Sequence, residues 1–325
     1  MTIHTKALVC TATVTALLWS GIAAAQDAAA NYPSRPVSVI VVVSPGGSAE
    51  AQVRVFTPKL QEGLGRPFVF DFKPGAGGTI GYAAAARSAP DGYTLLATTP
   101  AFTTTPAFMT LPYDPIKDLA PVVQLSRQSG IVVVNPGVPV NNLQEYVAYA
   151  RANPNKLNFG TMGAGSTAHL VGAWLNDLTG TQTTFIHYKG AQLSADLIAG
   201  NVQVTVGSNI NLSPLVKSGK LRALALAGPA RSAEYPDLRT AREQGVEFDY
   251  PSWVGITVST GTPPAIISKL NAEFMKILKL PETQQQSERL GSSPAGGTPA
   301  EFGKLIVEEI NRWKQLVKQT GIKPD

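Results

Sequence analysis

Short apolar runs alternate with segments of helical periodicity along most of this chain. The run VSVIVVV at 37–43 is continuous and rich in β-branched residues, which is typical of a strand buried on both faces. A helical pattern follows at 49–60. Further strands are expected at 67–72, 94–99, 157–160, 183–188, 202–207 and 222–227, and further helices at 82–87, 142–152, from 167, around 195 and near 215. Strands that alternate with helices in this way predict parallel sheets with crossover helices.

Two stretches interrupt this alternation, and we expect the chain to cross there between two lobes. The first lies near 123–131. The second lies at 247–258, where Pro and Trp interrupt a strand-like run before a helix that is expected to take Thr262 as its cap, followed by prolines. Two crossings predict an α/β fold of two Rossmann-like lobes joined by a paired hinge, with a ligand cleft between them. The expected division is 26–124 plus 252–325 for lobe 1 and 125–251 for lobe 2.

The first 25 residues differ in character and are typical of a secretory signal. Lys6 is their only strongly charged side chain, an apolar run follows at 7–24, and the three alanines at 23–25 have the small-x-small form of a cleavage site. We therefore predict export and cleavage after Ala25. The one cysteine of the chain, Cys10, lies inside this segment, which excludes disulfides, thiolate catalysis and cysteine metal sites from the mature chain.

The charge of the chain is a mild excess of bases and changes this interpretation little. There are 27 Lys and Arg against 22 Asp and Glu, a net charge of +5, and removal of Lys6 with the signal lowers it to +4. The bases are scattered, so nucleic acid is not an expected partner. The stretch at 302–323 is richer in Lys, but its apolar residues recur at helical spacing and predict a docked terminal helix.

The loop GTMGAGST at 160–167 comes close to several catalytic motifs but lacks a residue that each one needs. Ser166 stands where a nucleotide-binding P-loop has its Lys, and the acidic residue that a dinucleotide site requires about twenty positions later is absent. Ser166 also lies in AGSTA rather than in the G-x-S-x-G of a serine hydrolase. Neither His169 nor His187 has a recognisable acid partner or metal-ligating neighbours. We expect no enzyme activity, cofactor or metal, and a secreted hydrolase that uses Ser166 and His169 is the alternative.

Three glycine-rich loops each connect an expected strand to an expected helix. They are SPGGS at 44–48, PGAGG at 74–78 and GAGST at 163–167. Such loops point backbone N–H groups and the positive end of a helix into the space above a sheet, where a carboxylate binds without any catalytic group. PGAGG is expected to be only a tight turn. The other two loops also carry Ser or Thr hydroxyls and therefore predict a carboxylate site.

A series of segments in this order resembles one known family. The segments are YPSRP, SPGGSAEAQVR, KPGAGGTIG, APDGYTLL, LPYDPIKDLAPV, VVNPGVP, NPNKLNFGTMGAGSTAHL and GTPPAIISKLN. With them the chain resembles the periplasmic solute receptors of tripartite tricarboxylate transporters, the Bug family. The resemblance spans the mature chain and implies a receptor of the two-lobed type II periplasmic-binding-protein fold, which we expect to be monomeric. It also implies a periplasmic protein that captures a small carboxylate and delivers it to the membrane components of the transporter.

The resemblance further implies where the ligand binds. Ligands of the family include tricarboxylates, acidic amino acids, nicotinate and aromatic dicarboxylates such as terephthalate, and one carboxylate is typically held by the loops that match 44–48 and 163–167. A second carboxylate is expected at hydroxyl and amide groups after two other strands. The candidate ligand-binding residues are Ser44, Pro45, Gly46, Gly47, Ser48, Thr98, Thr99, Gly163, Gly165, Ser166, Thr167, His169, Tyr188, Gly207, Ser208 and Asn209.

The chain departs from the family at two places. Val43 and Ser44 stand where the family usually has an aromatic residue and a proline, and Gly207 stands where many members have an acidic residue. Loss of that acid removes both a partner for an ammonium group and a repulsion for a second carboxylate. We therefore expect a dicarboxylate without an ammonium group, aromatic or of medium length. A subunit that senses the ligand for a signalling protein is a further alternative, which differs only in its partner.

Overall fold

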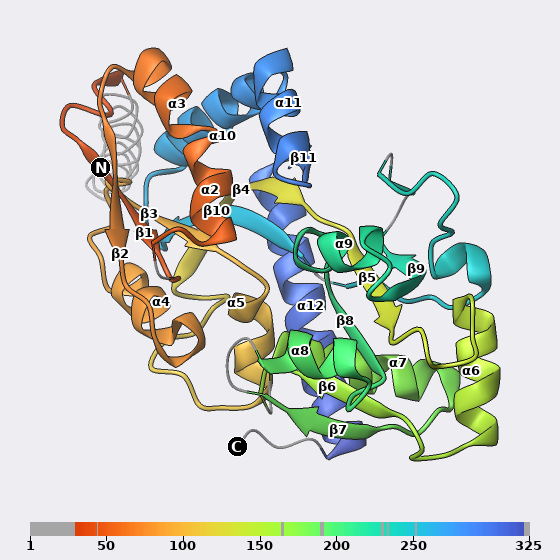
Figure 1. Cartoon of the computed structure of the whole chain (residues 1–325). Coiled ribbons are helices and arrows are strands. Elements are labelled where there is room, and N and C mark those ends of the chain that lie inside the picture. Colours follow the sequence, from red (N-terminus) through yellow and green to blue (C-terminus); the bar gives the residue numbers. More distant parts are fainter. Residues whose placement is uncertain are drawn as a thin grey trace, which may run out of the picture.

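The computed structural model describes residues 30–43, 45–163, 166–188, 192–228, 231–232, 234–250 and 252–321. The predicted signal segment, Ser44 and Gly165 lie outside these residues, and the side chain of Ser48 is also not described. Two β-sheets, each flanked by helices, form two lobes that lie side by side (Figure 1). This arrangement confirms the predicted two-lobed α/β fold.

Lobe 1 is built on a six-stranded mixed sheet. Its strands in spatial order are β11 (Ser293–Gly296), β4 (Leu119–Arg127), β10 (Trp253–Ser259), β3 (Thr94–Thr98), β1 (Val37–Val41) and β2 (Phe68–Phe72). The strands β2, β1 and β3 are parallel, as predicted. By contrast, β10 runs antiparallel to β3 and β4, because β4 leads the chain out to lobe 2 and β10 leads it back.

Lobe 2 has a five-stranded sheet with the same mixed character. Its strands in spatial order are β7 (Thr184–His187), β6 (Asn158–Thr161), β8 (Val204–Ser208), β5 (Gly130–Val134) and β9 (Arg222–Ala227). The strand β6 is parallel to β7 and β8, as predicted for βα units. The strand β5, which enters from lobe 1, is antiparallel to both of its neighbours.

Both faces of each sheet are buried, as the β-branched runs predict. In β1, Val39 and Val41 pack into one apolar cluster, whereas Ile40 packs into a second cluster on the opposite face. In β5, Val132 and Ile131 divide in the same way between two clusters of lobe 2. Side chains alternate along a strand, so each lobe has two cores with its sheet between them.

Helices cover these faces and differ from the prediction at two places. The single helix expected at 49–60 is broken, because Pro58 has no N–H to continue the helical hydrogen bonds of the preceding turn. The hydroxyl of Thr262 donates to the carbonyl of Ser259 at 2.8 Å, so the next helix is capped by Pro263 instead. The described helices are α2 (Ser48–Arg54), α3 (Thr57–Leu64), α4 (Thr79–Ala86), α5 (Ala101–Thr104), α6 (Leu143–Ala152), α7 (Thr167–Thr179), α8 (Gln192–Ala199), α9 (Asn209–Lys217), α10 (Pro264–Leu278), α11 (Pro281–Arg289) and α12 (Pro299–Thr320).

The chain crosses between the lobes at two neighbouring points. The backbone N–H of Gln128, after β4, donates to the carbonyl of Ser252, before β10, at 2.8 Å. The Gln128 side-chain oxygen also accepts from the hydroxyls of Ser252, at 3.0 Å, and Ser208, at 3.1 Å. The two crossings are thus hydrogen-bonded to each other and to the end of β8.

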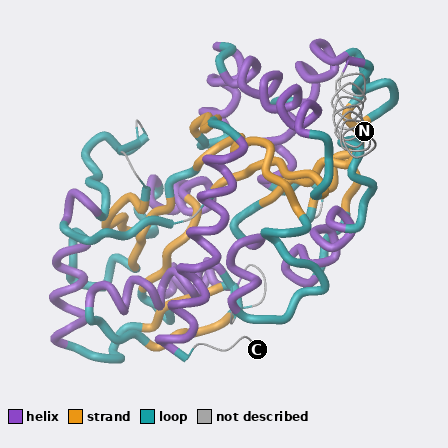
Figure 2. Tube along the Cα trace, turned by 180° about the vertical axis from the view of Figure 1, so that it is seen from behind, coloured by secondary structure: helices purple, strands orange, loops and turns teal. Residues whose placement is uncertain are grey.

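A long helix, α12, adds a third connection that the sequence did not predict. Its first half packs Phe302 and Ile306 into a core of lobe 1, and its second half packs Trp313 and Leu316 into a core of lobe 2. Seen from behind, α12 runs down the middle of the molecule (Figure 2). The division of the chain between the lobes stays a prediction. Across the described ranges, neither α12 nor any other helix is both long and apolar enough to span a bilayer.

Candidate ligand-binding site

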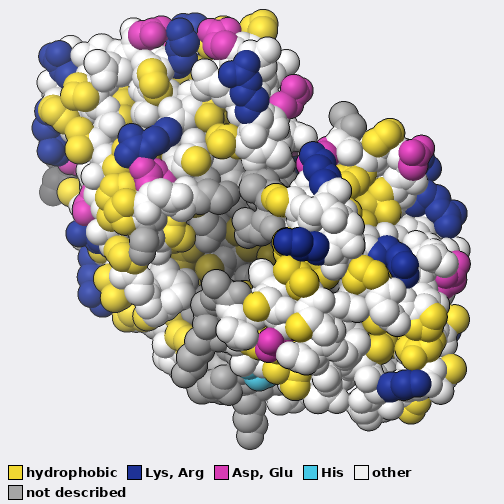
Figure 3. Space-filling model, viewed as in Figure 1, with side chains coloured by type: hydrophobic (Ala, Val, Ile, Leu, Met, Phe, Trp, Pro, Cys, Tyr) yellow, Lys and Arg dark blue, Asp and Glu magenta, His cyan; other side chains and the backbone are white. Residues whose placement is uncertain are grey.

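The surface of the molecule is hollowed between the two lobes (Figure 3). In the same orientation, α2 lies on the lobe 1 side of this hollow and α9 lies on the lobe 2 side (Figure 1). Each of these helices directly follows a strand that carries predicted ligand-binding residues at its carboxyl end. The hollow is therefore the candidate site.

The loop between β1 and α2 already holds a carboxylate of the protein itself. The side chain of Glu50 reaches back and accepts a hydrogen bond from the Gly46 N–H at 2.7 Å, and it also pairs with Arg54 at 2.5 Å. These two donors hold the pKa of Glu50 below its usual value. Glu50 lies three residues after the capping Gly47, from where a carboxylate reaches the start of a helix. One predicted amide donor of this loop is thus occupied by a residue that the sequence did not predict.

Two consecutive hydroxyl side chains lie at the end of β3 in lobe 1. Thr98 is fully buried, and its hydroxyl has no hydrogen-bond partner within the described part of the chain. The hydroxyl of Thr99 lies 3.1 Å from that of Tyr82, whose pKa is raised to about 12 by burial. Tyr82 is therefore neutral at physiological pH, so it can donate to Thr99 and leave the Thr99 proton for a ligand.

The loop between β6 and α7 forms the start of a helix on lobe 2. Ser166 caps α7, because its hydroxyl oxygen accepts from the backbone N–H of His169 at 3.3 Å. Its O–H proton stays available, since an acceptor role does not use it. Gly163 has a φ of 114°, a backbone conformation that favours glycine. The loop thus has the predicted geometry of a helix start with hydroxyl donors.

The ring of His169 packs against two other aromatic rings. Its side chain is 6% exposed, and its ring centre lies 4.7 Å from that of Phe185 and 4.6 Å from that of His187. The Nδ1 atom of His187 lies 2.6 Å from the hydroxyl of Thr161. Within the described residues, His, Asp and Glu side chains form no cluster that could hold a metal ion.

The end of β8 meets the hinge and a carboxylate from a distant loop. The hydroxyl of Ser208 donates to Gln128 at 3.1 Å, and the Asn209 Nδ2 group donates to Glu234 at 2.6 Å. The Ser208 proton and one of the two Asn209 amide protons, which were expected to meet a second carboxylate, are therefore already used. A Cβ atom at Gly207 would lie 3.2 Å from Leu212, so the glycine also leaves room for that side chain.

Tyr188 is likewise committed to a partner within lobe 2. Burial and a hydrogen bond with Asp196 raise the pKa of Tyr188 to about 12, and its backbone N–H donates to the carbonyl of Thr161 at 2.9 Å. The hydroxyl of Tyr188 thus donates its hydrogen bond to Asp196 in this structure. The expected contact of Tyr188 with the ligand stays a prediction.

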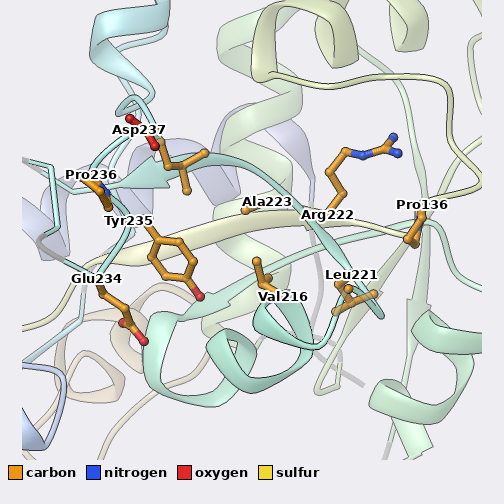
Figure 4. A pocket seen from close by; sticks show the side chains of 11 residues that line it. Pro136, Val216, Leu221, Arg222, Ala223, Glu234, Tyr235, Pro236 and Asp237 are labelled. Carbon is orange, nitrogen blue, oxygen red and sulfur yellow. The ribbon is translucent and has the colours of Figure 1, made fainter.

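A separate pocket of about 570 Å³ lies on lobe 2 beside β9. Figure 4 shows it between Arg222 on β9, Val216 on α9, and Tyr235 and Asp237 on the loop after β9. None of the predicted ligand-binding residues lines this pocket. It is therefore distinct from the hollow between the lobes.

Comparison with known proteins places this geometry in a family. Residues 52–322 match the family described as tripartite tricarboxylate transporter family receptor. Protein BugT of Bordetella pertussis is 34% identical over 305 residues, which cover 92% of this chain and 94% of BugT. An R. palustris protein solved with adipate is 31% identical, with a TM-score of 0.76, and covers 90% of this chain and 100% of its own. MatC of Rhodopseudomonas palustris, solved with bound malate, is 30% identical, with a TM-score of 0.72, and covers 88% of this chain and 100% of its own.

These relatives also decide between the receptor and the enzyme. The matched family is one of receptors, and two of the similar solved proteins carry adipate or malate. The expectation of a solute-binding protein, rather than a hydrolase that uses Ser166 and His169, is therefore confirmed. The chain belongs to the receptor family of the tripartite tricarboxylate transporters, whose members are periplasmic solute-binding proteins.

Proposed function

We propose that this protein captures a small dicarboxylate in the periplasm and delivers it to the membrane components of a tripartite tricarboxylate transporter. The observation that carries the proposal is a pair of strand-to-helix loops, one before α2, which lies beside the hollow, and one before α7. Each loop begins a helix, where the helix dipole and the N–H groups other than that of Gly46, which Glu50 occupies, favour an anion. The relatives solved with adipate and malate support a ligand with two carboxylates.

One ligand carboxylate meets the loops at 44–48 and 163–167 in this proposal. The second meets the hydroxyls of Thr98 and Thr99, because Gln128 engages the Ser208 proton and Glu234 engages one of the two Asn209 amide protons. The absence of an acid at Gly207 favours a dicarboxylate over aspartate or glutamate, whose ammonium group needs a carboxylate partner. An aromatic dicarboxylate such as terephthalate is one candidate of this class.

A thermal-shift screen tests the ligand class. Succinate, malate, adipate and terephthalate are compared with aspartate and glutamate at equal concentration. A ligand at 100 times its dissociation constant stabilises the fold by about 2.7 kcal/mol, enough to move the melting temperature visibly. A shift with the amino acids alone would show that the charge argument is wrong. Failure of every carboxylate would refute the proposed capture itself.

A further inference from the structure

One face of α9 carries three donors that converge on a single carboxylate. Asn209, Ser213 and Lys217 are four residues apart, so they lie in one row along the helix. Their Nδ2, Oγ and Nζ atoms lie 2.6, 2.5 and 2.7 Å from the carboxylate oxygens of Glu234. Glu234 comes from the loop after β9, and Figure 4 shows it beside the helix that carries Val216. The Glu234 carboxylate therefore binds side chains along the whole length of α9, including Asn209 at its start.

Glu234 is ionised at neutral pH. Burial by itself would raise the pKa of Glu234, but hydrogen bonds from Lys217, Ser213 and Asn209 outweigh that effect and hold the pKa below its usual value. An ionised carboxylate only accepts hydrogen bonds. The Asn209 side chain must therefore turn its NH2 group toward Glu234 and its carbonyl oxygen the other way.

The carbonyl oxygen of Asn209 is left as a buried acceptor. The side chain is 4% exposed, and its Oδ1 atom has no hydrogen-bond partner among the residues that the structure describes. The backbone N–H of Asn209 donates to the carbonyl of Ser129 at the hinge, at 3.1 Å. This corner thus lies at the carboxyl end of β8, next to the crossing between the lobes. A buried acceptor without a donor is costly, which makes a ligand donor favourable here.

The charges around Asn209 limit which ligand group can donate a hydrogen bond to its Oδ1 atom. A ligand carboxylate would bring a third set of acceptor oxygens beside Asn209 Oδ1 and Glu234, which is repulsive. A ligand ammonium would find no free negative charge, because Lys217 already neutralises Glu234. A hydroxyl group satisfies Oδ1 without a net charge.

We propose that Glu234 is a positioning residue for ligand specificity, which holds the Asn209 amide so that its oxygen accepts a hydrogen bond from a hydroxyl group on the carboxylate ligand. The inference rests on the proposed capture of a dicarboxylate and adds a hydroxyl to that ligand class. It also assigns a role to an acid that lies 25 residues from Asn209 in the sequence.

Succinate and L-malate test this role, because they differ by one hydroxyl group. Calorimetry on the mature protein should show that malate binds about fivefold to tenfold more tightly than succinate, the usual effect of one hydrogen bond. Asn209→Ala should bring the ratio close to one. Glu234→Gln should also lower it, because a neutral amide both donates and accepts and lets the Asn209 amide turn round. A change in the ratio of malate affinity to succinate affinity distinguishes this role from a loss of folded protein, because loss of folded protein lowers the binding of both acids equally.

Glu247→Gln is the matched control. Glu247 is an exposed acid of the same lobe that pairs with Arg242 at 3.2 Å, and its neutralisation should leave the ratio unchanged. If Glu234→Gln does not fold, Glu234→Asp replaces it, because the shorter side chain no longer reaches Asn209. A wild-type ratio near one, or an unchanged ratio in the folded Glu234 variant, would overturn the inference. If the protein binds other dicarboxylates but neither succinate nor malate, the inference is also overturned, whereas the proposed function stands.

Discussion

The unpaired hydroxyl of Thr98 offers the sharpest test of the site, because function and stability should respond in opposite directions. Thr98→Val keeps the branched shape of the side chain and removes only the hydroxyl. The side chain is 0% exposed to solvent, and its Oγ1 atom has no hydrogen-bond partner within the described residues. We therefore expect the variant to fold more stably and to bind its ligand more weakly.

The expected magnitudes follow from the cost of a buried, unpaired polar group. Leaving such a group without a partner costs roughly 1–3 kcal/mol, so the ligand-free variant should gain about 1 kcal/mol in its free energy of unfolding. For a mature chain of about 300 residues that gain raises the melting temperature by about 1.5 °C. Loss of one hydrogen bond to the ligand should weaken binding about fivefold.

Thr257→Val is the matched control on the neighbouring strand. Thr257 is equally buried and its hydroxyl is also unpaired within the described residues, but it pairs with Leu96, two positions back along β3 from Thr98. Its replacement should raise the melting temperature to a similar extent and leave ligand affinity unchanged. Melting without ligand and calorimetry with the tightest dicarboxylate measure the two effects. Unchanged affinity in Thr98→Val would remove Thr98 from the site, and a lower melting temperature would refute the stability argument.

Three further predictions concern the helix start, a buried acid and lobe motion. Ser166→Ala should lower the free energy of unfolding by about 1 kcal/mol through loss of the cap, and weaken ligand binding as well; urea unfolding and calorimetry that show no change would contradict this. Burial raises the pKa of Glu309 above its ordinary value of 4.5. The stability that the protonated Glu309 side chain contributes is therefore fully present below pH 4.5 and is lost as the pH rises through the folded-state pKa. Relative to Glu309→Gln, the wild-type free energy of unfolding should therefore fall as the pH rises above 4.5, and parallel pH profiles would refute this. Ligand should close the lobes about the paired hinge, so identical small-angle scattering curves with and without saturating dicarboxylate would point to a cleft that is already closed.

Sequence patterns predicted individual strands and helices well, because a strand or a helix start depends on residues that are close together in the chain. The run at 222–227 forms β9 over the whole of its predicted length, and the helix expected from Thr167 begins there with Ser166 as its cap. Alternation of apolar residues reports that both faces of a strand are buried, but not which strands become neighbours. The antiparallel pairing of β10 with β3 and β4 was therefore not predictable, since it depends on the path of the chain back from lobe 2.

The predicted helix boundaries were wrong at two places where a single residue decided them. Thr262 has the residue type of a cap and precedes a proline, yet its hydroxyl donates to the Ser259 carbonyl. Pro58 marked the break before α3, but the apolar spacing on either side favoured one continuous helix. In both cases the pattern identified a helix, and a property of one residue placed its start: a hydrogen bond of the Thr262 hydroxyl, and the missing N–H of Pro58.

The sequence by itself determined the fold class and the two crossings and led to the prediction of two carboxylate loops, because these depend on patterns within a few residues of each other. Only the tertiary structure decided which donors and acceptors of those loops remain for a ligand. Glu50 takes the Gly46 N–H, Gln128 takes the Ser208 hydroxyl, and Glu234 takes the Asn209 amide from 25 residues away. A hydrogen bond satisfies a group wherever its partner lies in the chain, so a list of polar residues in a loop overstates what the folded loop offers.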